Sequence, residues 1–67
     1  MSVVKVIELI GSSPNSWEEA SQNAIQVASK SVRGIIGIDV VHFTAKVKDG
    51  KISEYKANVK VAFIYED

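Results

Sequence analysis

The sequence predicts an α+β domain in the order strand–helix–strand–strand (βαββ), with a three-stranded antiparallel-type sheet wrapped around one helix. Three observations support this fold class. Residues 3–10 are rich in β-branched side chains, residues 17–33 repeat small apolar side chains at helical spacing, and residues 35–66 contain two alternating segments joined at Asp49-Gly50. A chain of 67 residues has room for one domain, residues 1–67, with a thin core.

The composition argues against several classes of protein. Eight basic and eight acidic residues give a formal charge of zero, which argues against a nucleic-acid surface and gives little electrostatic reason to bind a membrane. Because cysteine is absent, disulfides and cysteine-based metal sites are excluded. The N-terminal apolar run is too short and too charged for a transmembrane helix and lacks a signal-peptide layout, so we expect a cytoplasmic protein.

Residues 3–10 predict the first strand, which we expect to end at Gly11 before a loop over residues 12–16. Neither face of this strand is plainly polar. One face carries Val4, Val6 and Ile10, and the other carries Val3, Ile7 and Leu9.

The helix is predicted from about Trp17 to Arg33. Ser16 as N-cap with Glu19 three residues later forms a capping box, and Gly34 is a suitable stop after basic residues in the last turn. The apolar stripe consists of Ala20, Ala24, Val27, Ala28 and Ser31. A stripe made mostly of alanine allows the helix to lie close to a sheet.

The hairpin is predicted from Asp49-Gly50, a pair typical of a type I′ turn. With these two residues as the loop, Lys48 faces Lys51. The face expected to seat the helix then pairs Ile36 with Phe63, Ile38 with Val61, Val40 with Val59 and His42 with Ala57. The opposite face pairs Gly37 with Ala62, Asp39 with Lys60, Val41 with Asn58, Phe43 with Lys56 and Val47 with Ile52. Since both faces carry apolar side chains, we expect further copies of the chain to cover one of them.

Three segments together resemble the dodecin family over essentially the whole chain: VKVIELIGSSPNSWEEA, ASKSVRGI and GKISEYKANVKVAF. The resemblance implies a small βαββ subunit that assembles with identical copies into a hollow dodecamer. It also implies a protein that stores or buffers small ligands, often flavins such as FMN or riboflavin, in pockets between subunits. It implies a binding protein and not an enzyme.

Two positions depart from the pattern of flavin-binding dodecins. Those proteins carry a tryptophan near the start of the second strand that stacks on the flavin ring, and a glutamine nineteen residues later. The corresponding positions here are Gly37 and Lys56, while the only tryptophan, Trp17, opens the helix. Gly37 cannot stack, and Lys56 donates hydrogen bonds but accepts none. We therefore expect flavin binding to be weakened, altered or absent.

By resemblance, the candidate ligand-binding residues are Gly37, Lys56, Phe43 and Thr44. Gly37 as a bulge and Lys56 as an interface ion pair are the competing interpretations. Lys5 and Arg33 are candidate phosphate contacts by the same resemblance. The competing interpretation is that Lys5 is a solvated lysine and that Arg33 is a helix-terminal arginine that complements the helix dipole.

Some family members without the tryptophan are described as binding calcium, which leaves open a flavin-free protein that binds ions or forms a structural shell. The carboxylates near the hairpin are those of Asp39, Asp49, Glu54 and the chain termini, without EF-hand spacing. His42 has no second histidine or cysteine as a metal partner, and no catalytic constellation is present.

Overall fold

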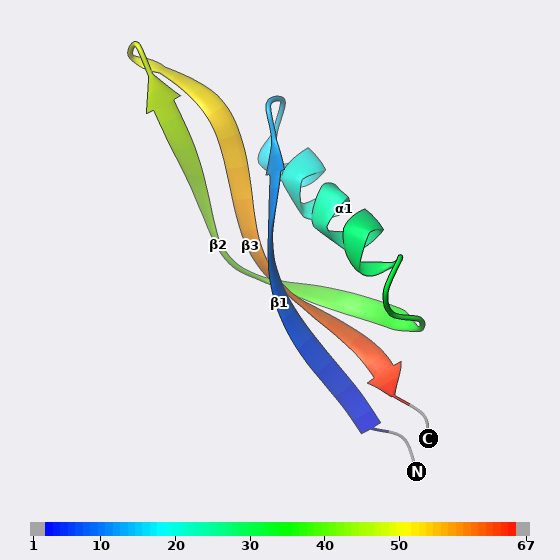
Figure 1. Cartoon of the computed structure of the whole chain (residues 1–67). Coiled ribbons are helices and arrows are strands. Elements are labelled where there is room, and N and C mark those ends of the chain that lie inside the picture. Colours follow the sequence, from blue (N-terminus) through cyan, green and yellow to red (C-terminus); the bar gives the residue numbers. More distant parts are fainter. Residues whose placement is uncertain (1–2, 66–67) are drawn as a thin grey trace.

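The computed structural model describes residues 3–65 and confirms the predicted element order (Figure 1). The elements are β1 (Val3–Ser13), α1 (Trp17–Ala28), β2 (Ile35–Lys48) and β3 (Lys51–Tyr65). The sheet order is β1-β3-β2, with β3 antiparallel to both neighbours, as predicted. The helix lies on one face of the sheet, the helix face. The other face, the open face, carries Lys56, Asn58, Lys60 and Ala62 of β3 together with their cross-strand partners.

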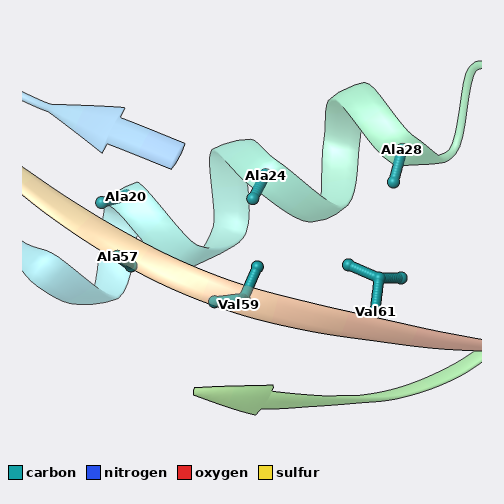
Figure 2. Packing of buried hydrophobic residues seen from close by; sticks show 6 residues of the cluster. All are labelled: Ala20, Ala24, Ala28, Ala57, Val59 and Val61. Carbon is teal, nitrogen blue, oxygen red and sulfur yellow. The ribbon is translucent and has the colours of Figure 1, made fainter. Parts of the chain in front are cut away.

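The core lies between α1 and β3 (Figure 2). Three helix alanines face three small residues of β3, and all six are buried: Ala20, Ala24, Ala28, Ala57, Val59 and Val61. Partly buried apolar residues surround this cluster, among them Ile7 and Leu9 of β1. Small side chains on both elements allow the helix to approach the sheet closely.

Gly11 lies where β1 passes close to α1. A Cβ at this position would overlap the carbonyl oxygen of Ala20 and would lie 2.9 Å from the Cβ of Ala24. The prediction that β1 ends at Gly11 was therefore wrong, since the strand continues to Ser13. The glycine is required by the helix contact and does not mark a strand end.

The predicted capping box is half formed. The Ser16 hydroxyl accepts a hydrogen bond from the Glu19 N–H at 3.0 Å, as expected for the N-cap. The Glu19 carboxylate, however, accepts two hydrogen bonds from the side chain of Asn15, at 3.0 and 3.1 Å. The Ser16 N–H instead donates to the hydroxyl of Ser13 at 3.4 Å. Buried Ser13 thus replaces the expected return contact.

The helix ends at Ala28, so the predicted end at Arg33 was wrong. The Ser29 hydroxyl donates to the carbonyl of Ile25 at 2.7 Å. The N–H groups of Lys30 and Ser31 donate to carbonyls three residues back, at 3.1 and 3.0 Å. These bonds tighten the chain and end the regular helix. The basic residues expected in the last turn lie beyond it, and Val27, assigned to the packed stripe, is 59% exposed.

The hairpin turn is confirmed, with φ of 53° at Asp49 and 76° at Gly50. The pairs Lys48–Lys51 and Val47–Ile52 are also as predicted, as are the pairs of Ile38, Val40, Gly37 and Asp39. Three irregularities interrupt the register, and each leaves one residue without a partner: Ser53 on β3, and Val41 and Ile36 on β2.

These bulges shift residues 42–46 by one position relative to β3. His42 therefore lies opposite Asn58, on the open face, and Phe43 lies opposite Ala57, on the helix face. The predicted placements of His42 and Phe43 were both wrong. Ile35, not Ile36, faces Phe63. Alternation gives the faces of a regular strand, but a bulge places two residues against one and reverses the faces beyond it.

The molecule is elongated, measuring 52 × 19 × 13 Å. Its radius of gyration is 13.6 Å, against about 11 Å for a compact chain of this length. The elongation comes from the hairpin arm, residues 41–53, in which every residue is exposed and which extends beyond α1 (Figure 1). A two-stranded hairpin is at best marginally stable in water. We therefore expect the hairpin arm to be stabilised by contacts with another chain.

Candidate ligand-binding face

The open face consists of four rows, each with one residue from every strand. Directly opposed residues of neighbouring strands point to the same face, so each row forms a line of side chains across the sheet. In order toward the hairpin arm, the rows are Val6–Ala62–Gly37, Glu8–Lys60–Asp39, Ile10–Asn58–His42 and Ser12–Lys56–Thr44.

Gly37 lies in the first row, at the apolar end of this face. It lines a shallow hollow of about 310 Å³ with Val6, Ile36 and Ala62, and two charged residues of the second row, Asp39 and Lys60, line it as well. A Cβ at Gly37 would have no neighbour within 4 Å. Open space therefore lies next to Gly37 on the open face.

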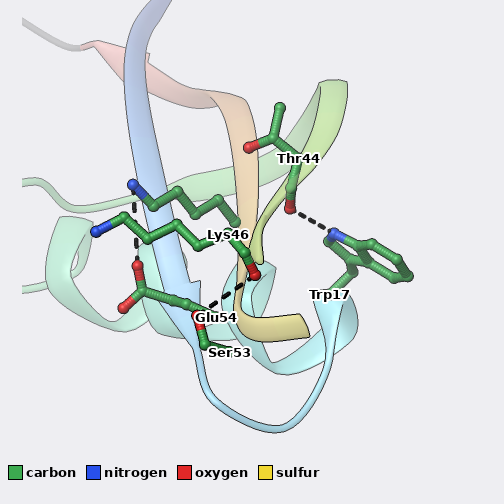
Figure 3. Close-up of polar contacts among 6 residues, drawn as sticks. Trp17, Thr44, Lys46, Ser53 and Glu54 are labelled. Carbon is green, nitrogen blue, oxygen red and sulfur yellow. Dashed lines mark hydrogen bonds and ion pairs between the residues drawn. The ribbon is translucent and has the colours of Figure 1, made fainter. Parts of the chain in front are cut away.

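Lys56 lies in the fourth row, between Ser12 and Thr44. Its Nζ lies 3.8 Å from Oε1 of Glu54 (Figure 3), and both side chains are about one-third exposed. The β3 partner of Gly37, Ala62, lies six positions from Lys56 along the strand, which corresponds to roughly 20 Å. A single copy does not bring Gly37 and Lys56 together, so one pocket that contains both positions requires two copies.

Phe43 is separated from the other candidate residues, because it lies on the helix face. There the Trp17 ring contacts both Phe43, at 5.9 Å between centroids, and Tyr55, edge-on at 4.8 Å. The Trp17 Nε1–H donates to the carbonyl oxygen of Thr44 at 2.8 Å (Figure 3). Sequence reasoning assigned Trp17 only to the start of the helix. No spacing signal points to these contacts, because they join residues 26 to 38 positions apart.

Lys5 and Arg33 lie at the opposite end of the sheet from the hairpin arm. The Nζ of Lys5 lies over the ring of Tyr65, 4.4 Å from its centroid. Arg33 lines a hollow of about 430 Å³ with Gly34, Ile64 and Tyr65. Tyr65 thus borders both candidate phosphate contacts.

Charged side chains alternate in the second row, where Lys60 lies between Glu8 and Asp39. The predicted register of Asp39 and Lys60 is correct, although the one ion pair within residues 3–65 is that of Lys56 and Glu54. In the same range no three His, Asp or Glu side chains are grouped closely enough to hold a metal ion. Glu66 and Asp67, at the C-terminus, lie outside the described residues.

Comparison with known proteins decides the family. The family model described as Dodecin matches residues 3–66. The chain belongs to the dodecin family. This finding confirms the resemblance seen in the sequence and, with the observed topology, the predicted dodecin fold. Dodecins are ligand-binding proteins.

This dodecin is similar in sequence and in structure to two known dodecins. Calcium dodecin of Mycobacterium tuberculosis is 44% identical over 64 residues, which cover 94% of this chain and 89% of that protein. A solved structure of that protein, described as having a novel calcium-binding site, is 41% identical and has a TM-score of 0.83, with 97% of this chain and 93% of that one covered. The structure of dodecin from Streptomyces coelicolor is 26% identical and has a TM-score of 0.95. The match covers 98% of this chain and 94% of that one.

In the part of the chain that the structure describes, no helix is long and apolar enough to cross a membrane.

Proposed function

We propose that this dodecin assembles into a homo-dodecamer and stores a small ligand between its copies, with a flavin such as FMN or riboflavin as the first candidate. The observation that carries the proposal is the apolar hollow at Gly37 on a face that the chain itself leaves uncovered. Its volume of about 310 Å³ lies at the lower limit of small-molecule sites. A second copy placed against it would complete a pocket. A cytoplasmic location belongs to the same proposal.

The chemistry of the hollow suits a flat ring better than a compact polar molecule. Its floor is apolar, from Val6 and Ala62, and Gly37 adds no side chain above it. Asp39 and Lys60 at the rim offer an acceptor and a donor for the polar edge of a ring. Without an aromatic side chain at position 37, the stacking contribution of about 0.5–1.5 kcal/mol is missing. We therefore expect weaker binding than in dodecins with the tryptophan.

Titration of riboflavin and FMN with the assembled protein tests this proposal, with flavin fluorescence as the signal. We expect saturable quenching at a fixed ratio of flavin to subunits. The variant Ala62→Glu places a charge on the floor of the hollow and should abolish the quenching while the far-UV circular dichroism stays unchanged. Flavin fluorescence that does not change at saturating protein would remove flavin from the proposal.

Calcium is the second candidate, because a relative 44% identical to this chain is a calcium dodecin. Glu8 and Asp39 lie in one row on either side of Lys60. Carboxylates from two copies that meet at this row would supply the oxygen ligands that calcium requires. Calorimetry of chelator-treated protein tests this, with Asp39→Asn as the variant expected to lose the heat of binding. Binding of calcium unaffected by Asp39→Asn would place the ion elsewhere.

A further inference from the structure

We propose that His42 makes the contact between copies at the open face depend on pH. The neutral imidazole permits a second copy to cover this face, and the protonated imidazole opposes it. This regulation rests on the proposed assembly, because it acts where one copy covers another. Three observations support it: the contact of His42 with Asn58, the balance of charge around the two residues, and the exposed apolar side chain in the same row.

The contact between His42 and Asn58 suits a neutral ring. Nε2 of His42 lies 3.4 Å from Nδ2 of Asn58, the residue directly opposite on β3. An amide nitrogen only donates hydrogen bonds, so the imidazole nitrogen must accept and cannot carry a proton. In a protonated imidazole both ring nitrogens donate. Protonation of His42 would therefore set two donors against each other.

The amide oxygen of Asn58 is out of reach of a protonated ring in this arrangement. Oδ1 is buried and has no hydrogen-bond partner among residues 3–65. To meet the ring, the side-chain amide would have to turn and bury its NH₂ group in place of the oxygen. The protonated imidazole therefore either loses this contact or forces Asn58 to rearrange. Either change alters the surface that a second copy would cover.

The charges around His42 are balanced when its ring is neutral. The two adjacent rows of the open face contain two cations and two carboxylates: Lys56 and Lys60 of β3, Glu8 of β1 and Asp39 of β2. The next pair toward the hairpin tip, Lys46 and Glu54, is balanced as well. A proton on His42 adds one unmatched positive charge to each copy. Where the open faces of two copies meet, these charges lie on both sides of the contact, and like charges across an interface weaken association.

Ile10 connects the protonation of His42 to assembly. It lies in the same row as Asn58 and His42 and is 66% exposed in the single chain. A copy that covers Ile10 therefore also covers His42 and removes water from its ring. Removal of water disfavours the charged imidazole far more than the neutral one. Separation of the copies consequently takes up protons, so acid shifts the equilibrium toward separated copies.

Analytical ultracentrifugation of the ligand-free protein at about pH 8 and about pH 5.5, at equal ionic strength, tests this switch. Histidine is the side chain that changes its charge in this range, and His42 is the only histidine in the chain. We expect fewer subunits per particle at the lower pH, with unchanged far-UV circular dichroism and reassembly when the pH is restored. The dissociation constant of the contact should rise by up to about tenfold per pH unit for each imidazole.

Three variants assign the response to His42. His42→Gln stays neutral and should remain assembled at both pH values. His42→Lys is charged at both and should form smaller particles at both. Asp39→Asn, which removes a carboxylate of the adjacent row, should keep the response of the wild type.

Each contrary outcome has a distinct meaning. Equal particle size of the wild type at both pH values would refute the switch and leave assembly intact. A response that persists in His42→Gln, or full assembly of His42→Lys, would also overturn it. A single chain at both pH values would refute the proposed assembly and the switch together.

Discussion

The indole of Trp17 donates a hydrogen bond to the carbonyl oxygen of Thr44 at 2.8 Å and so joins the first residue of α1 to β2 across 27 positions. Phe43, which precedes Thr44, and Tyr55, which precedes Lys56, contact the same ring on the helix face. The side chains of Thr44 and Lys56 lie on the opposite face. Trp17 therefore supports, from the helix face, the strand segment that carries Thr44 and Lys56 on the open face.

Trp17→Phe should keep most of the ring packing and remove the hydrogen bond to Thr44. We expect a loss of about 0.5–1.5 kcal/mol in the free energy of unfolding. Urea unfolding followed by circular dichroism measures this change, since the substitution removes the only tryptophan. The matched variant Phe43→Leu removes one ring contact and leaves the hydrogen bond. A Trp17→Phe protein as stable as the wild type would show that the bond contributes nothing.

Gly11→Ala should destabilise the fold. The new Cβ would overlap the carbonyl oxygen of Ala20, so the helix must move away from β1 at a cost of roughly 1–3 kcal/mol. Gly37→Ala is the control, because its Cβ meets nothing within 4 Å, and its effect should stay within about 0.5 kcal/mol. Thermal unfolding of the two variants checks the difference. Equal melting temperatures would contradict the close approach at Gly11.

The sequence predicted the elements and most of the sheet correctly, because local signals specify them. Asp49-Gly50 gave the turn, Ser16 gave the helix start, and the alternation gave the order of strands. The errors arise where tertiary contacts determine where a strand ends and which face a residue occupies. Gly11 resembles a strand end, but the alanine face of α1 requires it within the strand. The unpaired Val41 carries no local signal, yet it reverses the faces of His42 and Phe43.

In the candidate site, too, local signals place residues on strands, and tertiary contacts decide the rest. Lys56 and Thr44 lie opposite each other on neighbouring strands, whereas Ala62, the β3 partner of Gly37, lies six positions from Lys56. The contacts of Trp17 with Phe43, Thr44 and Tyr55 were missed, because they depend on where α1 crosses the sheet. A chain of this length gives no sequence signal for a crossing position.

Val47→Lys combined with Ile52→Lys should weaken assembly. These residues face each other on the hairpin arm and are 68% and 45% exposed, so one chain buries little of either. A second copy that covers them would have to bury two charges, which is costly. Analytical ultracentrifugation should show fewer subunits per particle, with the secondary structure retained. Lys51→Gln, at the tip of the same arm, should assemble normally, and full assembly of the double variant would exclude the arm as an interface.

Gly37→Trp combined with Lys56→Gln should strengthen riboflavin binding by up to about tenfold, because an aromatic ring stacks in the open space above position 37. Fluorescence titration with riboflavin checks this outcome. Assembled protein with undetectable riboflavin binding would mean that the hollow has a shape unsuited to the ring.

Native mass spectrometry of the purified protein tests assembly and ligand storage together, because it counts the copies and weighs any ligand they retain. We expect a particle of twelve subunits with extra mass that matches a small bound ligand and leaves when the particle is dissociated. A folded single chain of about 7.3 kDa at micromolar concentration would contradict it, since the open face and the hairpin arm would then remain uncovered.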